Sequence, residues 1–226
     1  MKLLLLYLAN RGCGYGHYYR CQALIQTAGQ QGHELRTISD HTFSYYQLTN
    51  GLEDKQTIYE ALTWRPDWLV IDLQESAPRW LINMARAFNT KIANINDVGQ
   101  IDESNEADVV WTQDVPERVI LRQSVLNTTW TPDYKWFVWG GGADRLGLLS
   151  YFALTVPKEP AWLVHTDLIP CDAMPGSRSQ ESIRTYNNNF LWYLSKCKQV
   201  CAACGMNMWE NARLGIPQYL VSLTPM

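Results

Sequence analysis

The sequence predicts an α/β protein built from two Rossmann-like halves, each a parallel sheet flanked by helices. Short apolar segments alternate with segments of helical spacing along the chain, an order typical of doubly wound parallel sheets. In each half a glycine-rich turn lies between a strand-like segment and a helix-like one. A turn-rich passage at 127–133 interrupts the alternation, which then restarts, so we expect domains at 1–133 and 134–226.

The composition is that of an ordinary globular protein. Of the 226 residues, 46% are hydrophobic and 18% are charged, which is enough for a substantial core. The net charge of −3 and the absence of Lys and Arg clusters argue against nucleic acid as the main partner. The apolar run at 3–9 enters the glycine-rich turn without a cleavage site, so we interpret it as a first strand. No other run approaches the length of a membrane span, and we expect a cytoplasmic protein.

In the first half, the pattern predicts five strands and three helices. Strands are expected at 3–8, 34–39, 68–72, 91–95 and 107–111, and helices at 18–31, 54–64 and 77–88. Asp72 ends the third strand and Asp97 follows the fourth. Because open parallel sheets bind ligands at the carboxyl ends of their strands, both carboxylates are candidate ligand-binding groups.

The second half repeats this alternation on a smaller scale. Strands are expected at 136–139, 162–165, 199–204 and 218–222, with helices ending near 154 and spanning 190–197 and 208–214. The segment 168–189 contains Pro170, Pro175 and Gly176 and predicts a long loop that is mobile or lines a site.

The turn after the first strand is the strongest candidate for a site. Gly14 and Gly16 let the backbone approach a ligand, and the following helix directs unpaired N–H groups toward an anion. His17 lies at the junction of turn and helix and titrates near neutrality, which makes it a candidate general base. A structural turn with a surface histidine is the alternative. The spacing also departs from G-x-G-x-x-G, which disfavours a nicotinamide or flavin site without excluding it.

The six cysteines do not complete a metal site. Cys201 and Cys204 form a C-x-x-C pair with Cys197 nearby, but no second pair and no neighbouring histidine accompany them. The segment 200–204 instead indicates a buried strand of small residues with reduced thiols. We therefore expect neither a metal ion nor a cofactor.

Two separated motifs carry a family resemblance. The segment Gly14-x-Gly16-His17-x-x-Arg20-Cys21 resembles the N-terminal signature of the UDP-sugar hydrolases of pseudaminic acid biosynthesis and of their spore-coat polysaccharide relatives. The segment 204–210, followed by Gly215-Ile216-Pro217, is similar to the G-x-[ST]-x-x-E…G-x-P element that this family shares with the glycosyltransferases of lipid II synthesis. The resemblance covers most of the chain.

The resemblance implies the two-domain GT-B architecture, with a nucleotide-sugar held in a cleft between the domains. It assigns to His17 the activation of water, or of an acceptor hydroxyl in a transferase, with the nucleoside diphosphate as leaving group. It also implies that substrate is bound by a set of residues from both domains: Gly14, Gly16, Arg20, Asp72, Asp97, Gly140, Gly141, Gly205, Met206, Asn207 and Glu210.

The second glycine turn agrees physically with nucleotide binding. The turn 205–207 opens a helix whose amides suit a diphosphate. Glu210, one turn into that helix, suits two ribose hydroxyls. A glutamate that merely complements the helix dipole is the alternative for Glu210.

The chain also departs from the family pattern. Leu73-Gln74 replaces a Ser-Tyr pair, Asn96 replaces an acid, and the chain ends at Met226 where the family continues with further helices. Either a partner protein or a second copy covers that face of the second domain, or the chain is a fragment, or it is a compact or degenerate member. A non-catalytic nucleotide-sugar-binding or scaffold protein remains the alternative to an enzyme.

Overall fold

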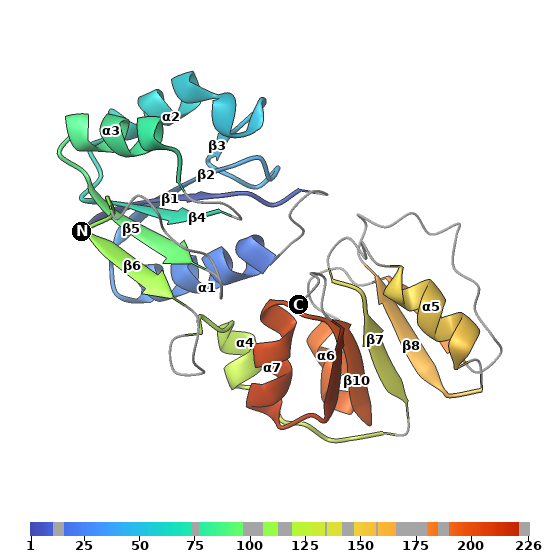
Figure 1. The fold of residues 1–226 in the computed structure, drawn as a ribbon. Coiled ribbons are helices and arrows are strands. Elements are labelled where there is room, and N and C mark those ends of the chain that lie inside the picture. The colour runs from blue at the N-terminus through green and yellow to red at the C-terminus, as the bar shows by residue number, and fades with distance from the viewer. Residues whose placement is uncertain are drawn as a thin grey trace. The chain divides into compact units, whose positions relative to one another are not determined.

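A computed structural model describes ten segments of the chain, namely 1–10, 16–73, 77–96, 106–112, 119–133, 135–141, 147–156, 158–165, 180–184 and 190–221. They belong to two compact units, Met1–Ile120 and Leu121–Met226 (Figure 1). In the segments that the structure describes, no helix is both long enough and apolar enough to cross a membrane.

The first unit contains a six-stranded sheet in which all strand pairs are parallel. Its order is β3-β2-β1-β4-β5-β6, the doubly wound order in which the chain first builds outward on one side of β1 and then on the other. The strands are β1 (Lys2–Tyr7), β2 (Glu34–Ser39), β3 (Tyr46–Gln47), β4 (Trp68–Asp72), β5 (Lys91–Asn96) and β6 (Val109–Thr112).

Helices cover both faces of this sheet, which explains why β1 is apolar at every position from Leu3 to Leu6. Helix α1 (Gly16–Gln30) lies on one face, and α2 (Lys55–Leu62) and α3 (Arg79–Ala87) lie on the other (Figure 1). Leu4 and Leu6 pack in the core beneath α2 and α3, whereas Leu5 and Tyr7 pack with Cys21 of α1. A short 3-10 turn, η1 (Gly51–Glu53), precedes α2.

The second unit contains a five-stranded parallel sheet in the order β11-β10-β7-β8-β9. Its strands are β7 (Trp136–Trp139), β8 (Ala161–His165), β9 (Gln180–Arg184), β10 (Gln199–Ala203) and β11 (Gln218–Val221). Its helices are α4 (Gln123–Leu126), α5 (Leu148–Thr155), α6 (Phe190–Lys196) and α7 (Met206–Leu214). Alternate residues of β7 enter two cores, with Phe137 packing near α6 and Val138 near α5.

The structure differs from the sequence expectations in the second unit. Strand β9 lies inside the segment 168–189, which we expected to be a loop. The prediction is wrong for these residues because a short polar edge strand carries no periodic apolar signal. The rest of that loop lies outside the described residues. Helix α7 begins at Met206, two residues earlier than expected. Cys204 is exposed, although we expected it in a buried strand.

The division between the units also lies earlier than the sequence indicated. It falls after Ile120, whereas we expected a boundary after residue 133. Part of the intervening segment is bonded to the second unit. Trp130 donates its indole N–H to the Cys197 carbonyl at 2.8 Å, and the Thr131 amide donates to the Ser195 carbonyl at 2.8 Å.

Candidate functional site

Both sheets reverse their direction of growth at one point, and the predicted site residues cluster at these points. In the first sheet the reversal lies between β1 and β4, and in the second it lies between β7 and β10. Loops that leave the carboxyl ends of two such strands run in opposite directions and leave room for a ligand. The His17 turn follows β1 and Asp72 ends β4, while Gly140 follows β7 and Gly205 follows β10.

His17, Arg20 and Asp72 form a buried polar cluster in the first unit. His17 Nδ1 lies 2.7 Å from Asp72 Oδ1, and Arg20 donates from Nε to Asp72 Oδ2 at 2.7 Å. Arg20 also donates from Nη2 to Oδ1. One helical turn separates His17 from Arg20 on α1, so both side chains face the end of β4. His17 is only 5% exposed, and Arg20 and Asp72 are buried.

The carboxylate fixes the tautomer of the imidazole. Burial raises the pKa of the Asp72 carboxyl, but the Arg20 charge and the hydrogen bonds from His17 and Arg20 outweigh it, and the pKa is lowered overall. Asp72 is therefore ionised and has no proton to donate. Arg20 Nη2 also lies 3.1 Å from Nδ1 of His17, but the shorter 2.7 Å contact joins Nδ1 to the ionised carboxylate, and we therefore assign the proton to Nδ1. In the neutral imidazole, this leaves the lone pair on Nε2, the nitrogen that can accept a proton.

Cys21 completes the surroundings of the carboxylate. Its thiol lies 3.5 Å from Asp72 Oδ2 and donates to it. Burial, and next the charge of Asp72, raise the pKa of the Cys21 thiol well above its usual value. The thiol therefore stays protonated and serves Asp72 as a hydrogen-bond donor, which makes it a poor nucleophile.

The structure brings together part of the predicted first-unit site. His17, Arg20 and Asp72 meet, and Gly16 is the first residue of α1. Gly14 and Asp97 lie outside the described residues. The roles of all these residues in catalysis or substrate binding stay predictions.

In the second unit the two glycine turns come close together. Gly140 and Gly141 follow β7, which pairs with β10, and Gly205 precedes α7. Gly141 has φ +83°, and a Cβ placed on it would lie 4.0 Å from Cβ of Ala203 at the end of β10. The backbone of Met206 and Asn207 forms the first turn of α7, so their N–H groups lie at the positive end of this helix.

Glu210 has a partner that the sequence reasoning missed. Arg122, just before α4, donates from Nε to Oε1 and from Nη2 to Oε2 of Glu210, each at 2.7 Å. The guanidinium also lies 5.4 Å from the Phe190 ring centroid. This two-pronged contact holds the buried carboxylate in one orientation and uses one lone pair on each oxygen. No local signal connects residues separated by 88 positions.

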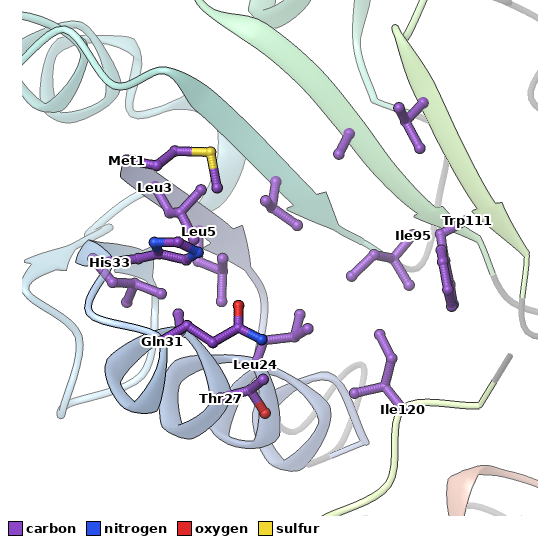
Figure 2. Close-up of a pocket in the computed structure, with 15 residues that line it drawn as sticks. Met1, Leu3, Leu5, Leu24, Thr27, Gln31, His33, Ile95, Trp111 and Ile120 are labelled. Atoms are coloured by element: carbon purple, nitrogen blue, oxygen red, sulfur yellow. The ribbon is translucent and has the colours of Figure 1, made fainter.

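An apolar pocket of about 340 Å³ lies elsewhere in the first unit. Figure 2 shows Leu24 and Thr27 of α1 on one side and Ile95 and Trp111 of the strands on the other. The described residues that line it include none of the predicted site residues. The cluster of His17, Arg20 and Asp72 therefore lies outside this pocket.

Comparison with known proteins identifies relatives by structure alone. A scan against protein-family models finds no match, and a search of curated proteins finds no significant relative. A UDP-GlcNAc 2-epimerase from Methanocaldococcus jannaschii, in complex with UDP-GlcNAc and UDP, is similar with a TM-score of 0.59 and 10% identity, over 97% of this chain and 83% of the other.

Two glycosyltransferases are also similar. SnogD from Streptomyces nogalater has a TM-score of 0.56 and 12% identity, over 98% of this chain and 82% of its own. An alpha-glucosyltransferase in complex with UDP and a 13-mer DNA has a TM-score of 0.54 and 14% identity, over 97% of this chain and 78% of its own. At such low identity the similarity establishes the fold. The predicted fold class, two Rossmann-like parallel-sheet units of GT-B type, is therefore confirmed.

Proposed function

We propose that this chain is a UDP-sugar hydrolase or a closely related glycosyltransferase in which His17 is the general base. The observation that carries the proposal is the 2.7 Å contact between His17 Nδ1 and the ionised Asp72, which leaves Nε2 as the proton acceptor. This pair lies at the reversal point of its sheet, where open α/β sheets bind ligands. A carboxylate that orients and stabilises an imidazole is a recurring feature of acid–base catalysis.

The reaction consists of one displacement. Nε2 of His17 takes a proton from water or from an acceptor hydroxyl while that oxygen forms a bond to the anomeric carbon of the sugar. The bond from this carbon to the phosphate oxygen breaks, and UDP leaves with the electron pair. A positioned base of this kind contributes roughly 10²–10⁴-fold to a rate.

In this proposal the second unit binds the leaving group. Backbone N–H groups at the start of α7 suit the charge of a diphosphate, and the glycines at 140, 141 and 205 let the backbone approach it. Glu210 accepts ribose hydroxyls through the lone pairs that Arg122 leaves unused, and Arg122 acts as its positioning residue.

The similar structures support the choice of nucleotide. The epimerase and the alpha-glucosyltransferase were both solved with UDP bound. The resemblance of the two sequence motifs to the pseudaminic acid hydrolases points to the same class of substrate. We also propose that the protein acts in the cytoplasm, where nucleotide-sugars are made.

The test is release of UDP from a panel of UDP-sugars. We expect turnover by the wild-type chain and a loss of at least about 100-fold in His17→Ala. His33→Ala removes a histidine three residues beyond the C-terminal end of α1, and this matched control should retain full activity. Unchanged turnover in His17→Ala would remove the proposed mechanism.

The burial of His17 favours a second candidate, a non-catalytic nucleotide-sugar-binding or scaffold protein. An imidazole that is 5% exposed has little open surface for a substrate. This candidate predicts that UDP raises the melting temperature while no UDP-sugar is consumed. Stabilisation by NAD and not by UDP would instead indicate a dinucleotide-binding protein.

The expected contact of the second unit with a partner or a second copy also stays a proposal. Its described surface includes the exposed side chains of Tyr219 and Leu220 on the edge strand β11. Burial of these side chains in an oligomer, measured by hydrogen exchange of β11 at rising protein concentration, would support it.

A further inference from the structure

We propose that a row of packed aromatic rings near His17 binds a carbohydrate acceptor, so that the reaction is transfer to a sugar hydroxyl in preference to hydrolysis. This inference rests on the proposed function. The row, called here the aromatic platform, consists of Tyr19, Tyr18, His41 and Phe43. Successive ring centroids lie 5.4, 4.4 and 5.2 Å apart, and the Tyr18 and His41 rings are stacked at 29°.

The platform lies at the same edge of the sheet as the proposed base. Tyr18 follows His17 in the first turn of α1, and its ring centroid is 6.4 Å from that of Tyr7 at the end of β1. His41 lies two residues beyond the end of β2, which pairs in parallel with β1. Figure 1 shows α1 beginning at the end of the sheet toward which the β1 arrow points. The rings and the base therefore belong to one ligand-binding edge.

The platform is most exposed at its Phe43 end. Tyr19, Tyr18 and His41 are half-buried, whereas the side chain of Phe43 is 77% exposed, although its ring packs against His41 at 41°. Tyr45, two residues further on, is also exposed. Phe43 and Tyr45 therefore place two exposed rings at this edge of the sheet, where a ligand can contact them.

Polar groups next to the platform favour a carbohydrate over a purely apolar ligand. Asp40 precedes His41, and its carboxylate accepts hydrogen bonds from the Ala9 amide at 2.8 Å and from the Asn10 side chain. A sugar presents C–H groups on its ring faces and hydroxyls around its rim. Flat rings suit the faces, and a fixed carboxylate and amide suit the hydroxyls.

The acceptor hydroxyl then takes the place of water in the displacement. His17 Nε2 removes its proton, the sugar oxygen forms the bond to the anomeric carbon of the donor, and UDP departs with the electron pair of the broken bond. A bound acceptor next to the base has an effective concentration far above that of a free one, which favours transfer.

The test measures sugar binding and UDP binding separately on the full chain. The probes are maltose, cellobiose and N,N′-diacetylchitobiose, observed by saturation-transfer NMR, with 4-nitrophenol as the aromatic comparison. We expect at least one disaccharide to bind through its ring C–H protons. Phe43→Ala should weaken that binding about tenfold, and Phe43→Trp should restore it.

Controls separate this inference from the proposed function. Tyr151→Ala removes a ring that is 66% exposed in the second unit and should leave sugar binding unchanged. UDP should raise the melting temperature of the wild type and of Phe43→Ala equally. Absence of UDP binding in the wild type would refute the proposed function. UDP binding without any disaccharide binding, binding of 4-nitrophenol alone, or sugar binding unaffected by Phe43→Ala would each overturn the acceptor platform.

Discussion

Replacing Asp72 with asparagine tests the polar cluster most directly. The wild-type carboxylate accepts from His17, Arg20 and Cys21 and is fully buried. Asparagine has nearly the same shape but one oxygen, so it loses acceptors and leaves the buried Arg20 charge without a counter-charge. Breaking a buried ion pair on one side costs about 3–5 kcal/mol. We therefore expect the free energy of unfolding to fall by that amount and the melting temperature by roughly 6–20 °C.

The assay is urea unfolding followed by circular dichroism, with a surface charge removal as the control. Glu106→Gln neutralises a carboxylate that pairs with the exposed Arg79, at an Nε–Oε1 distance of 3.4 Å. Exposed pairs contribute at most about 1 kcal/mol, so this control should remain close to the wild type. Both variants lose one negative charge. The difference between their free energies of unfolding therefore measures how much more the buried Asp72 pair contributes than an exposed one.

A double-mutant cycle tests whether Arg20 is the partner whose loss destabilises Asp72→Asn. Arg20→Met removes the guanidinium, and the combination with Asp72→Asn should destabilise less than the sum of the two single changes, by at least about 1 kcal/mol. If Asp72→Asn unfolds within 1 kcal/mol of the wild type, or if the two effects simply add, the reasoning about this cluster is refuted.

The same structure supports three further predictions. Folding lowers the pKa of Asp72, so its contribution to stability is complete above the unfolded pKa near 3.9 and is lost as the pH falls through the folded pKa. In urea titrations below about pH 5, the unfolding free energy of the wild type should therefore decline more steeply than that of Asp72→Asn. A lysine cannot make the two-pronged contact with Glu210, so Arg122→Lys should lower the free energy of unfolding by about 1–3 kcal/mol, measured with urea. The surface change Arg86→Lys should lower it by less than about 1 kcal/mol. Equal losses in the two variants would contradict the argument. Gly141 has φ +83°, so Gly141→Ala should lower the free energy of unfolding by about 1–2 kcal/mol, seen as a lower melting temperature. Gly29 lies inside α1 with no atom within 4 Å of an added Cβ, so Gly29→Ala should raise the free energy of unfolding by up to about 1 kcal/mol. Changes of the same sign in both variants would show that backbone conformation does not decide these effects.

Local patterns predicted most of the regular structure. The strands β2, β4 and β7 have the bounds expected from the sequence. For β4 and β7, a short apolar run between turn residues is itself the signal for a buried strand. Helix starts were less well predicted. Helix α7 begins two residues early because Gly205 serves as its N-cap without any side-chain hydrogen bond to mark the position.

Elements without a periodic signal escaped the sequence reasoning. The strand β9 and the short helix α4 each depend on neighbours elsewhere in the chain, β9 on its pairing with β8 and α4 on its packing against α7. A tertiary contact stabilises such segments, and their own sequences carry little preference.

The sequence by itself determined the alternation of strands and helices, the glycine turns and the residue types that can take a proton or meet an anion, because these depend on spacing of a few residues. Only the tertiary structure decided which side chains meet. His17 is 55 positions from Asp72, and Arg122 is 88 positions from Glu210. Their contacts follow from the parallel order of the sheets and the packing of the helices, in which the chain brings together groups that no local pattern connects.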